Sequence, residues 1–263
     1  MKGQFRSSIR RYNSSKGGNE MYLKSCKVLQ DNIVDKDQYP FNIPSLQELQ
    51  ELEFPTNVTF FVGENGSGKS TLLEAIADRC DFNTAGGGRQ NLYEVHKAES
   101  SLGDYIRLSW WPKISNGFFL RSETFYQFAS HIDLLENHPN KYAAFGGKSL
   151  HHQSHGESFL SLFMNRFKGK AIYLLDEPEA ALSPTRQLSL LKIMKDLEHE
   201  AQFIIATHSP ILLGYPKATI YSFDDGEIES IRYEDTIHYI VTKRFLSAPE
   251  TIFSELFNEE RES

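Results

Sequence analysis

The sequence predicts an α/β fold in which helices flank a mainly parallel β-sheet. Continuous apolar runs of buried-strand length recur at residues 58–62, 171–175 and 203–206. Segments with the apolar spacing of amphipathic helices lie between these runs. Buried strands that alternate with amphipathic helices are typical of a parallel sheet whose two faces are covered.

Size and composition fit a globular protein. The chain has 263 residues, of which 40% are hydrophobic and 24% charged, which is ordinary globular usage. Its net charge of −7 disfavours a globally basic nucleic-acid-binding protein but leaves room for a local basic patch. Cys26 and Cys80 are the only cysteines, which disfavours a disulfide scaffold and favours a reducing cytosol. No apolar stretch approaches the roughly 18 residues of a membrane span, so we expect no integral membrane segment and a cytoplasmic location.

Residues 1–20 differ in composition from the rest of the chain. They carry five basic residues and one acidic residue among serines and glycines, and Phe5, Ile9 and Tyr12 have helical spacing. We expect a flexible basic tail. A mitochondrial transit peptide, or an extension upstream of a start at Met21, would give a similar composition. Residues 21–263 are expected to form a single domain.

The first half of this domain is expected to begin with strands at 22–29 and 58–62. A Gly-rich turn and a helix at 70–79 follow the second strand. One face of that helix is apolar and consists of Leu72, Leu73, Ile76 and Ala77. Further along, a Gly-rich loop is expected at residues 86–88. Two aromatic segments follow it, at 105–111 and 118–128.

The second half alternates between helices and strands. A helix at 157–167 precedes the strand at 171–175. Ser183 suits the N-cap of the next helix, and Pro184 suits its first position. The remaining expected strands are 203–206, 219–223 and 227–233.

The turn after the strand at 58–62 matches the GxxxxGK[ST] pattern in full. Such a turn between a buried strand and a helix predicts a phosphate-binding loop and hence a P-loop NTPase. Its glycines let backbone N–H groups converge on phosphate oxygens, and the helix N-terminus favours negative charge. Lys69 is expected to reach the β- and γ-phosphates of ATP, and the Ser70 hydroxyl to hold Mg²⁺. The candidate nucleotide-binding residues are Gly63, Glu64, Asn65, Gly66, Ser67, Gly68, Lys69, Ser70 and Thr71.

Two carboxylates follow the apolar run at 171–175. Asp176 is the first charged residue after this expected strand and is placed to bind Mg²⁺ through water. Glu177 would then face the attacking water as a general base. Together with the phosphate-binding loop, this pair predicts a magnesium-dependent ATPase.

A histidine lies just beyond the next expected strand. His208 comes 32 residues after Asp176, on what we expect to be the neighbouring strand. A lone histidine at such a place is often a structural hydrogen-bonding residue. Its proximity to the predicted ATP site favours contact with the γ-phosphate instead.

In these motifs the chain resembles the ABC-type ATPase family. Residues 63–71 are similar to its Walker A motif, 174–178 to its Walker B motif with the catalytic glutamate, and His208 to its switch histidine. The resemblance covers about residues 21–240 and implies an ABC-ATPase head. It also implies a helical signature insertion at about 82–170.

The family signature, LSGGQ, is similar to the segment 153–157. Ser154 and Gly156 match it, whereas His155 replaces a glycine and Glu157 the glutamine. In the family this segment contacts ATP across an interface, so the resemblance implies an ATP-dependent, head-to-tail homodimer. The histidines at 151, 152 and 155 suggest a zinc site as an alternative, but they have no cysteine or carboxylate among them.

Other family motifs are less complete. The segment 180–183 replaces the D-loop and lacks its aspartate. Either Glu123 or Gln127 is a candidate for the Q-loop residue, and Tyr39 is a candidate for adenine stacking. Only 83 residues separate Thr71 from Ser154, which leaves no room for long coiled-coil arms.

Three functions share this predicted ATPase. The motifs resemble those of compact, stand-alone ATPases of the DNA-maintenance branch, which implies a role in DNA maintenance or defence with nucleic acid or a protein as partner. A transporter's ATP-binding subunit is the second possibility. The third is a nucleotide-dependent assembly switch with low turnover.

Overall fold

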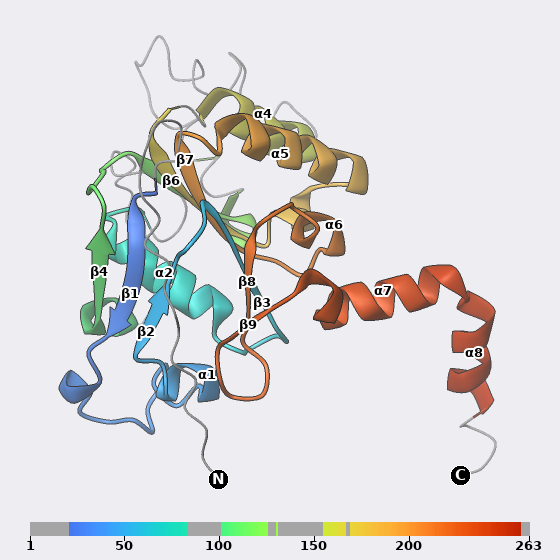
Figure 1. The fold of residues 1–263 in the computed structure, drawn as a ribbon, viewed down its shortest axis with the longest axis horizontal. Coiled ribbons are helices and arrows are strands. Elements are labelled where there is room, and N and C mark those ends of the chain that lie inside the picture. The colour runs from blue at the N-terminus through green and yellow to red at the C-terminus, as the bar shows by residue number, and fades with distance from the viewer. Residues whose placement is uncertain (1–20, 84–100, 126–129, 131–154, 167–168, 259–263) are drawn as a thin grey trace.

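The computed structural model describes residues 21–83, 101–125, 130, 155–166 and 169–258 (Figure 1). Its larger sheet has six strands in the order β5-β6-β7-β3-β8-β9. Every neighbouring pair is parallel except β8 and β9. The expected α/β class with a mainly parallel sheet is therefore confirmed. The strands are β3 (Val58–Val62), β5 (Gly117–Arg121), β6 (Ala171–Asp176), β7 (Ala201–Ala206), β8 (Thr219–Ser222) and β9 (Glu229–Ile231).

A second, antiparallel sheet of three strands has the order β2-β1-β4. These strands are β1 (Leu23–Val28), β2 (Glu51–Glu53) and β4 (Ile106–Trp110). A buried glutamine of β7, Gln202, joins this sheet to the larger one. Its Oε1 accepts hydrogen bonds from the backbone N–H groups of Tyr22 and Leu23, at 3.1 and 2.8 Å, and its Nε2 donates to the Leu23 carbonyl at 2.9 Å.

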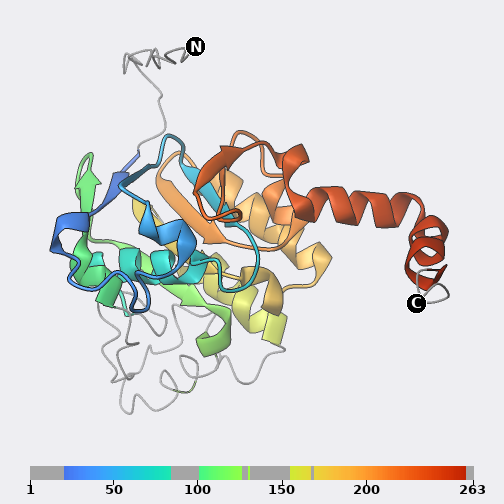
Figure 2. The same ribbon diagram turned by 90° about the horizontal axis from the view of Figure 1, so that it is seen from below.

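Helix α2 (Lys69–Arg79) lies between the two sheets (Figures 1 and 2). The apolar face predicted from its spacing is buried, and it packs in one core with residues of both sheets. Helices α4 (His155–Arg166), α5 (Pro184–Leu197) and α6 (Pro210–Leu213) cover the opposite face of the larger sheet. This second core contains Phe159, Phe163 and Phe203. Apolar side chains thus cover both faces of the sheet, as parallel strands require.

Most expected elements differ from the observed ones only at their ends. Helix α4 begins at His155, two residues earlier than expected, so Gly156 lies in its first turn. Pro184 occupies the first position of α5, as predicted. Ser183 occupies the N-cap, also as predicted, although its side chain makes no capping hydrogen bond. Short elements complete the described chain: α1 (Pro44–Gln47) and the 3₁₀ helices Gln30–Asn32, Ser101–Tyr105, Ser122–Thr124, Pro178–Ala181 and Tyr233–Asp235.

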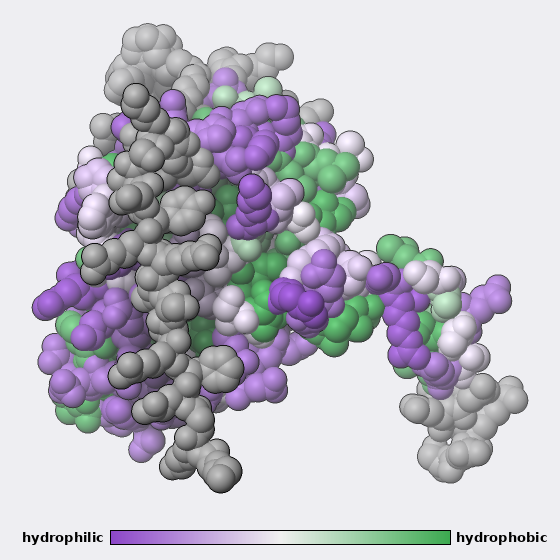
Figure 3. Space-filling view, viewed as in Figure 1, coloured by the Kyte–Doolittle hydropathy of each residue, from purple (hydrophilic) through white to green (hydrophobic). Residues whose placement is uncertain are grey.

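Two helices near the C-terminus were not predicted. Helix α7 (Ile237–Ser247) and helix α8 (Pro249–Asn258) form what we call the C-terminal arm, residues 237–258. The arm projects away from the two sheets in both views (Figures 1 and 2), and hydrophobic atoms lie at its surface (Figure 3). Its exposed large apolar residues are Ile237, Ile240, Val241, Phe245, Leu246, Phe253, Leu256 and Phe257.

Two predicted regions fall largely outside the described residues. These are the basic tail at 1–20 and much of the insertion at 82–170. Among the helices that the structure does describe, none combines the length and the apolar character needed to cross a bilayer.

Candidate nucleotide site

The loop between β3 and α2 has the backbone that its glycines allow. Gly63, Gly66 and Gly68 have φ angles of 141°, 80° and 100°, a range that side-chain-bearing residues rarely adopt. A Cβ added to Gly68 would lie 3.0 Å from Ser45 Oγ. That same hydroxyl donates a hydrogen bond to the Ser67 carbonyl at 2.5 Å. Helix α1 therefore packs directly against the loop and supports its shape.

Lys69 begins α2 and is almost fully buried, with 4% of its surface exposed. Its Nζ donates hydrogen bonds to the carbonyl oxygens of Gly63 and Glu64, at 2.6 and 2.8 Å. Burial lowers the pKa of this ammonium, whereas the carboxylates of Glu177 and Asp224 act in the opposite direction. The loop thus holds a cation at its centre.

The next residue of α2 meets the end of β6. Ser70 Oγ donates to Asp176 Oδ1 at 2.8 Å, although β7 separates β6 from β3 in the sheet. Burial raises the pKa of Asp176 to about 6, and the hydrogen bond from Ser70 and the charge of Arg121 oppose that rise. A hydroxyl and a carboxylate are hard oxygen ligands of the kind that Mg²⁺ prefers. The residues present therefore fit a magnesium ion bound with a nucleotide.

Arg121 is a further member of this site, and no sequence motif indicated it. It is the last residue of β5, and its guanidinium lies 3.4 Å from Asp176, 3.3 Å from Glu74 and 3.5 Å from Glu123. It therefore offsets part of the negative charge beside the predicted metal ligand. A signal was present in the sequence, because Arg121, like Asp176, is the first charged residue after an apolar run and ends a strand.

Glu177 follows β6 with a left-handed backbone, at φ 49° and ψ 52°, which is uncommon for a residue other than glycine. Its N–H donates to the Ala206 carbonyl at 2.9 Å, and its carbonyl accepts from Ser122 Oγ at 2.6 Å. The side chain remains 40% exposed, and its Oε1 lies 3.7 Å from Nε2 of His208. A fixed backbone thus presents a solvent-accessible carboxylate next to Asp176.

His208 lies between β7 and α6, next to Glu177 as the sequence suggested. Its backbone N–H donates to Glu179 Oε1. Its Nδ1 lies 2.9 Å from Nε2 of His238, the second residue of α7. Burial and the charge of Lys69 lower the pKa of His208, so the neutral imidazole is favoured near pH 7.

The structure brings five predicted residues together at the carboxyl ends of β3, β6 and β7, where open α/β sheets bind ligands. They are Lys69, Ser70, Asp176, Glu177 and His208.

Other predicted residues are not brought into this group. Gly156 lies in α4, on the face of the sheet opposite α2, and Ser154 and Gln127 lie outside the described residues. Tyr39 is exposed, and its hydroxyl lies 3.3 Å from Thr71 Oγ1. Stacking of Tyr39 on adenine stays a prediction. Glu123 pairs with Arg121.

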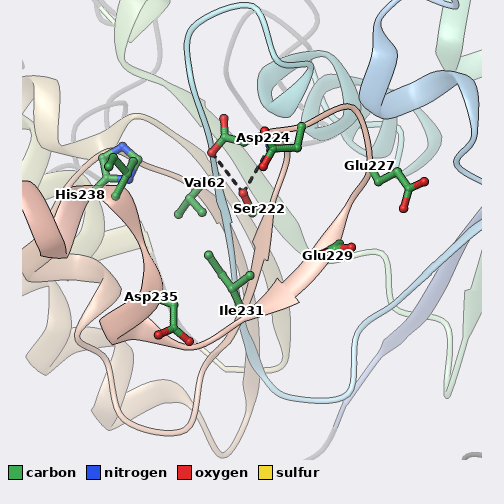
Figure 4. A pocket seen from close by; sticks show the side chains of 10 residues that line it. Val62, Ser222, Asp224, Glu227, Glu229, Ile231, Asp235 and His238 are labelled. Atoms are coloured by element: carbon green, nitrogen blue, oxygen red, sulfur yellow. Dashed lines mark hydrogen bonds between the residues drawn. The ribbon is translucent and has the colours of Figure 1, made fainter. Parts of the chain in front are cut away.

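An acidic pocket of about 410 Å³ adjoins the loop (Figure 4). Asp224 is part of its lining and accepts a hydrogen bond from the Glu64 N–H at 2.8 Å. His238 lies at one side of the pocket (Figure 4). Its other acidic lining residues are Asp225, Glu227, Glu229 and Asp235. Such a wall repels phosphate, so it borders the loop without extending its anion-binding surface.

Comparison with known proteins adds two family matches. A family described as "AAA domain" matches residues 41–125, which include the loop. A family described as "AAA domain, putative AbiEii toxin, Type IV TA system" matches residues 159–214, which include Asp176 and His208. Both matched families are described as AAA domains, and together with the loop between β3 and α2 they support an AAA-type ATPase family for this chain.

Individual relatives are distant. The "Brefeldin A resistance protein" of Schizosaccharomyces pombe is 26% identical over 213 residues, which cover 69% of this chain and 14% of that protein. This chain therefore spans a small part of that relative's length. Among solved structures, an SMC head domain from Thermotoga maritima has 16% identity and a TM-score of 0.43, covering 81% of this chain and 99% of its own. An ATP-binding cassette of an ABC transporter has 16% identity and a TM-score of 0.48, covering 89% and 98%.

Proposed function

We propose that this protein binds and hydrolyses ATP with Mg²⁺, at a site that a second copy completes. One observation carries the proposal: a hydroxyl from α2 and a carboxylate from β6 meet at 2.8 Å beside a buried lysine. This is the oxygen pair that a magnesium nucleotide needs, next to the cation that a polyphosphate needs.

Binding rests on the loop and on α2. Lys69 already points back toward the loop, where it donates to two carbonyl oxygens. Phosphate oxygens are stronger, charged acceptors for the same ammonium. The N-terminus of α2, an 11-residue helix, adds its positive end to this attraction. The loop and the helix thus attract the same polyanion.

Four residues would act on the bound nucleotide during hydrolysis. Bound Mg²⁺-ATP would supply the electrophilic phosphorus and a metal that neutralises the charge of the phosphate oxygens. Asp176 and Ser70 would hold that metal. Glu177 accepts a proton from the attacking water, and His208 donates a hydrogen bond from Nε2 to the γ-phosphate. Glu177 is suited to its part because its carboxylate is exposed while its backbone is held on both sides.

The second copy would contribute Ser154 and Gly156. Gly156 lies in the first turn of the 12-residue helix α4, where backbone N–H groups have no partner within the helix. Such groups bind anions. A head-to-tail pair of copies would bring this turn to the nucleotide of its partner, so that ATP is buried between two copies. We propose that residues 21–263 act as one domain in this dimer and that residues 1–20 are a flexible tail.

For the biological role we favour DNA maintenance or defence, in the cytoplasm. The description of the family that matches residues 159–214 refers to a putative toxin of a toxin–antitoxin system, which supports defence. A nucleic acid or a partner protein would then be the second ligand. The transporter subunit and the assembly switch stay as alternatives.

The first test is the mass of Glu177→Gln in solution, measured by light scattering with and without Mg²⁺-ATP. We expect a monomer without nucleotide and a dimer with it, because loss of the base removes hydrolysis and leaves binding intact. Turnover should fall by about 10²- to 10⁴-fold. Lys69→Ala is the control that should bind nucleotide poorly and stay monomeric. Equal turnover in the wild type and Glu177→Gln would overturn the assignment of the base.

A second set of measurements separates the three roles. Stimulation of turnover by DNA would support DNA maintenance or defence, and co-purification with a membrane protein would support a transporter. Near-zero turnover together with ATP-driven assembly would support the switch.

A further inference from the structure

The backbone around His208 is held from several sides. Its N–H donates to Glu179 Oε1, and the N–H of the preceding Thr207 donates to the Phe61 carbonyl at 3.1 Å. The following Ser209 caps α6, where its Oγ accepts from two backbone N–H groups of the helix, and it donates to Gln187. These contacts hold the backbone of His208 in place. They do not determine which of its ring nitrogens carries the proton.

Among the described residues, the ring of His208 has one hydrogen bond, and it goes to α7. His208 Nδ1 and His238 Nε2 are 2.9 Å apart. The start of α7 is well anchored, because Thr236 is buried and its Oγ1 accepts from the Tyr239 N–H at 3.3 Å. One turn earlier, the Tyr233 hydroxyl donates to the Pro210 carbonyl of α6 at 2.8 Å. His238 is therefore presented to His208 from a fixed helix end.

When both rings are neutral, two arrangements of this pair are possible, because one of the two nitrogens in contact must donate the hydrogen bond and the other must accept it. If His208 donates, its Nε2 is a bare lone pair facing the Glu177 carboxylate at 3.7 Å, and His238 keeps a buried Nδ1–H without a partner among the described residues. If His238 donates, His208 carries its proton on Nε2 and offers it toward Glu177. Each arrangement leaves one buried N–H and one buried lone pair without a hydrogen-bond partner among the described residues. They differ at Glu177, because its carboxylate attracts an N–H on Nε2 of His208 and repels a lone pair there.

We infer that His238 is a positioning residue, which donates its Nε2–H to Nδ1 of His208 and so holds the proton of His208 on Nε2. The contact made by one nitrogen of a histidine sets the protonation of the other. His208 Nε2 is buried and has no hydrogen-bond partner among the described residues. That leaves its N–H free for an acceptor arriving beside Glu177, which in the proposed function is the γ-phosphate.

This inference rests on the proposed function for the identity of that acceptor, but its first test does not need ATP. The test is the ¹⁵N NMR spectrum of ¹⁵N-histidine-labelled full-length protein, with His208→Gln used to assign the signals of His208. In the wild type we expect a neutral His208 with the proton on Nε2 and a hydrogen-bonded, unprotonated Nδ1. A His208 with its proton on Nδ1 would overturn the inference, whether or not the protein hydrolyses ATP.

Two substitutions of His238 form a matched pair. Gln places an amide N–H near the position of the imidazole Nε2 and can still donate, whereas Met has a similar size but no donor. His238→Gln should keep the Nδ1 signal of His208 and retain turnover within about twofold of the wild type. His238→Met should lose the hydrogen-bonded Nδ1 signal. Its kcat should fall by about tenfold, the lower end of the range seen when an orienting partner of a ligand histidine is removed, with KM for ATP little changed.

The outcomes separate the two proposals. Equal kcat and equal Nδ1 signals in His238→Met and the wild type would overturn the positioning role. The positioning role would also be overturned if both variants are folded and His238→Gln loses turnover as His238→Met does. A restored hydrogen-bond donor would then have no effect. A wild type with no ATPase activity but with the expected spectrum would contradict the proposed function alone.

Discussion

The nucleotide end of the large sheet and the C-terminal arm differ in which side chains they bury and which they expose to solvent. At the nucleotide end even charged groups are enclosed, since Lys69 and Asp176 are each 4% exposed. In the arm, α7 has no buried residue at all, and Leu246 is 73% exposed. Charges are thus buried where partners exist for them, and large apolar side chains are exposed where the described part of the chain provides no cover.

This difference shows that buried charges and exposed apolar side chains depend on different kinds of neighbouring groups. A buried charge must be compensated by nearby groups, and Ser70, Arg121 and two backbone carbonyls provide that compensation here. An exposed apolar helix face has no such need, but surfaces of this kind often mark interaction sites. The comparison can be tested with substitutions whose effect on the free energy of unfolding follows from the local environment.

The largest effect is expected in the core beneath the nucleotide end. Phe203 of β7 is fully buried, and its ring centroid lies 5.2 Å from that of Tyr173 on β6. Phe203→Ala should lower the free energy of unfolding by about 3–5 kcal/mol, because it removes apolar contacts and leaves a cavity. Urea denaturation would measure this. A loss below about 1 kcal/mol would mean that the sheet is not packed as described.

Asp176→Asn should have an effect of the opposite sign. Because burial raises the pKa of Asp176 from 3.8 to about 6, the folded state favours the protonated acid, and ionising it at pH 7 opposes folding. Two pKa units correspond to at most about 3 kcal/mol. Without Mg²⁺, the variant should therefore be more stable than the wild type at pH 7, by about 1–3 kcal/mol.

The pH dependence provides the control for Asp176→Asn. Below about pH 3 the carboxyl is mostly protonated in both the folded and the unfolded state, because the lower of the two pKa values is 3.8, so the gain should disappear there. Urea denaturation in a chelator at pH 7 and at about pH 3 would test this. A variant that is less stable than the wild type at pH 7 would show that the contacts with Ser70 and Arg121 outweigh burial.

The smallest effect is expected in the arm. Leu246→Ala removes an exposed side chain from α7, and surface changes of this kind usually alter the free energy of unfolding by less than about 0.5 kcal/mol. The same urea experiment, run beside Phe203→Ala, gives the contrast directly. A loss above about 2 kcal/mol would show that the arm is covered in solution and would remove the distinction between the two regions.

Local signals were sufficient for the large sheet and for the centre of the site. The strand at Val58–Val62 was predicted with its observed ends, because its residues are apolar apart from Thr59, and all five are buried. The meeting of Ser70 and Asp176 follows from two motifs, each next to a buried strand. Arg121 had a similar signal, the first charge after an apolar run, but no motif drew attention to it.

Other features depend on contacts that the sequence does not reveal. His238 comes 30 residues after His208, and no local pattern indicates that the two rings meet. Helix α7 has a helical apolar spacing at Ile237, Ile240 and Val241, but burial normally explains such spacing and these side chains are exposed. Ser183 shows the converse: it occupies the predicted N-cap position, but its side chain makes no capping hydrogen bond.

The geometry of the arm has a mechanical consequence. Helix α7 has 11 residues, so at 1.5 Å per residue it is about 16 Å long. Its first turn touches the histidine beside the nucleotide loop, while its far end lies outside the body of the protein (Figure 1). A tilt of about 10° at the first turn would move the far end by about 3 Å, given that length. A small change of angle beside His208 would therefore become a displacement of several ångströms where α7 meets α8.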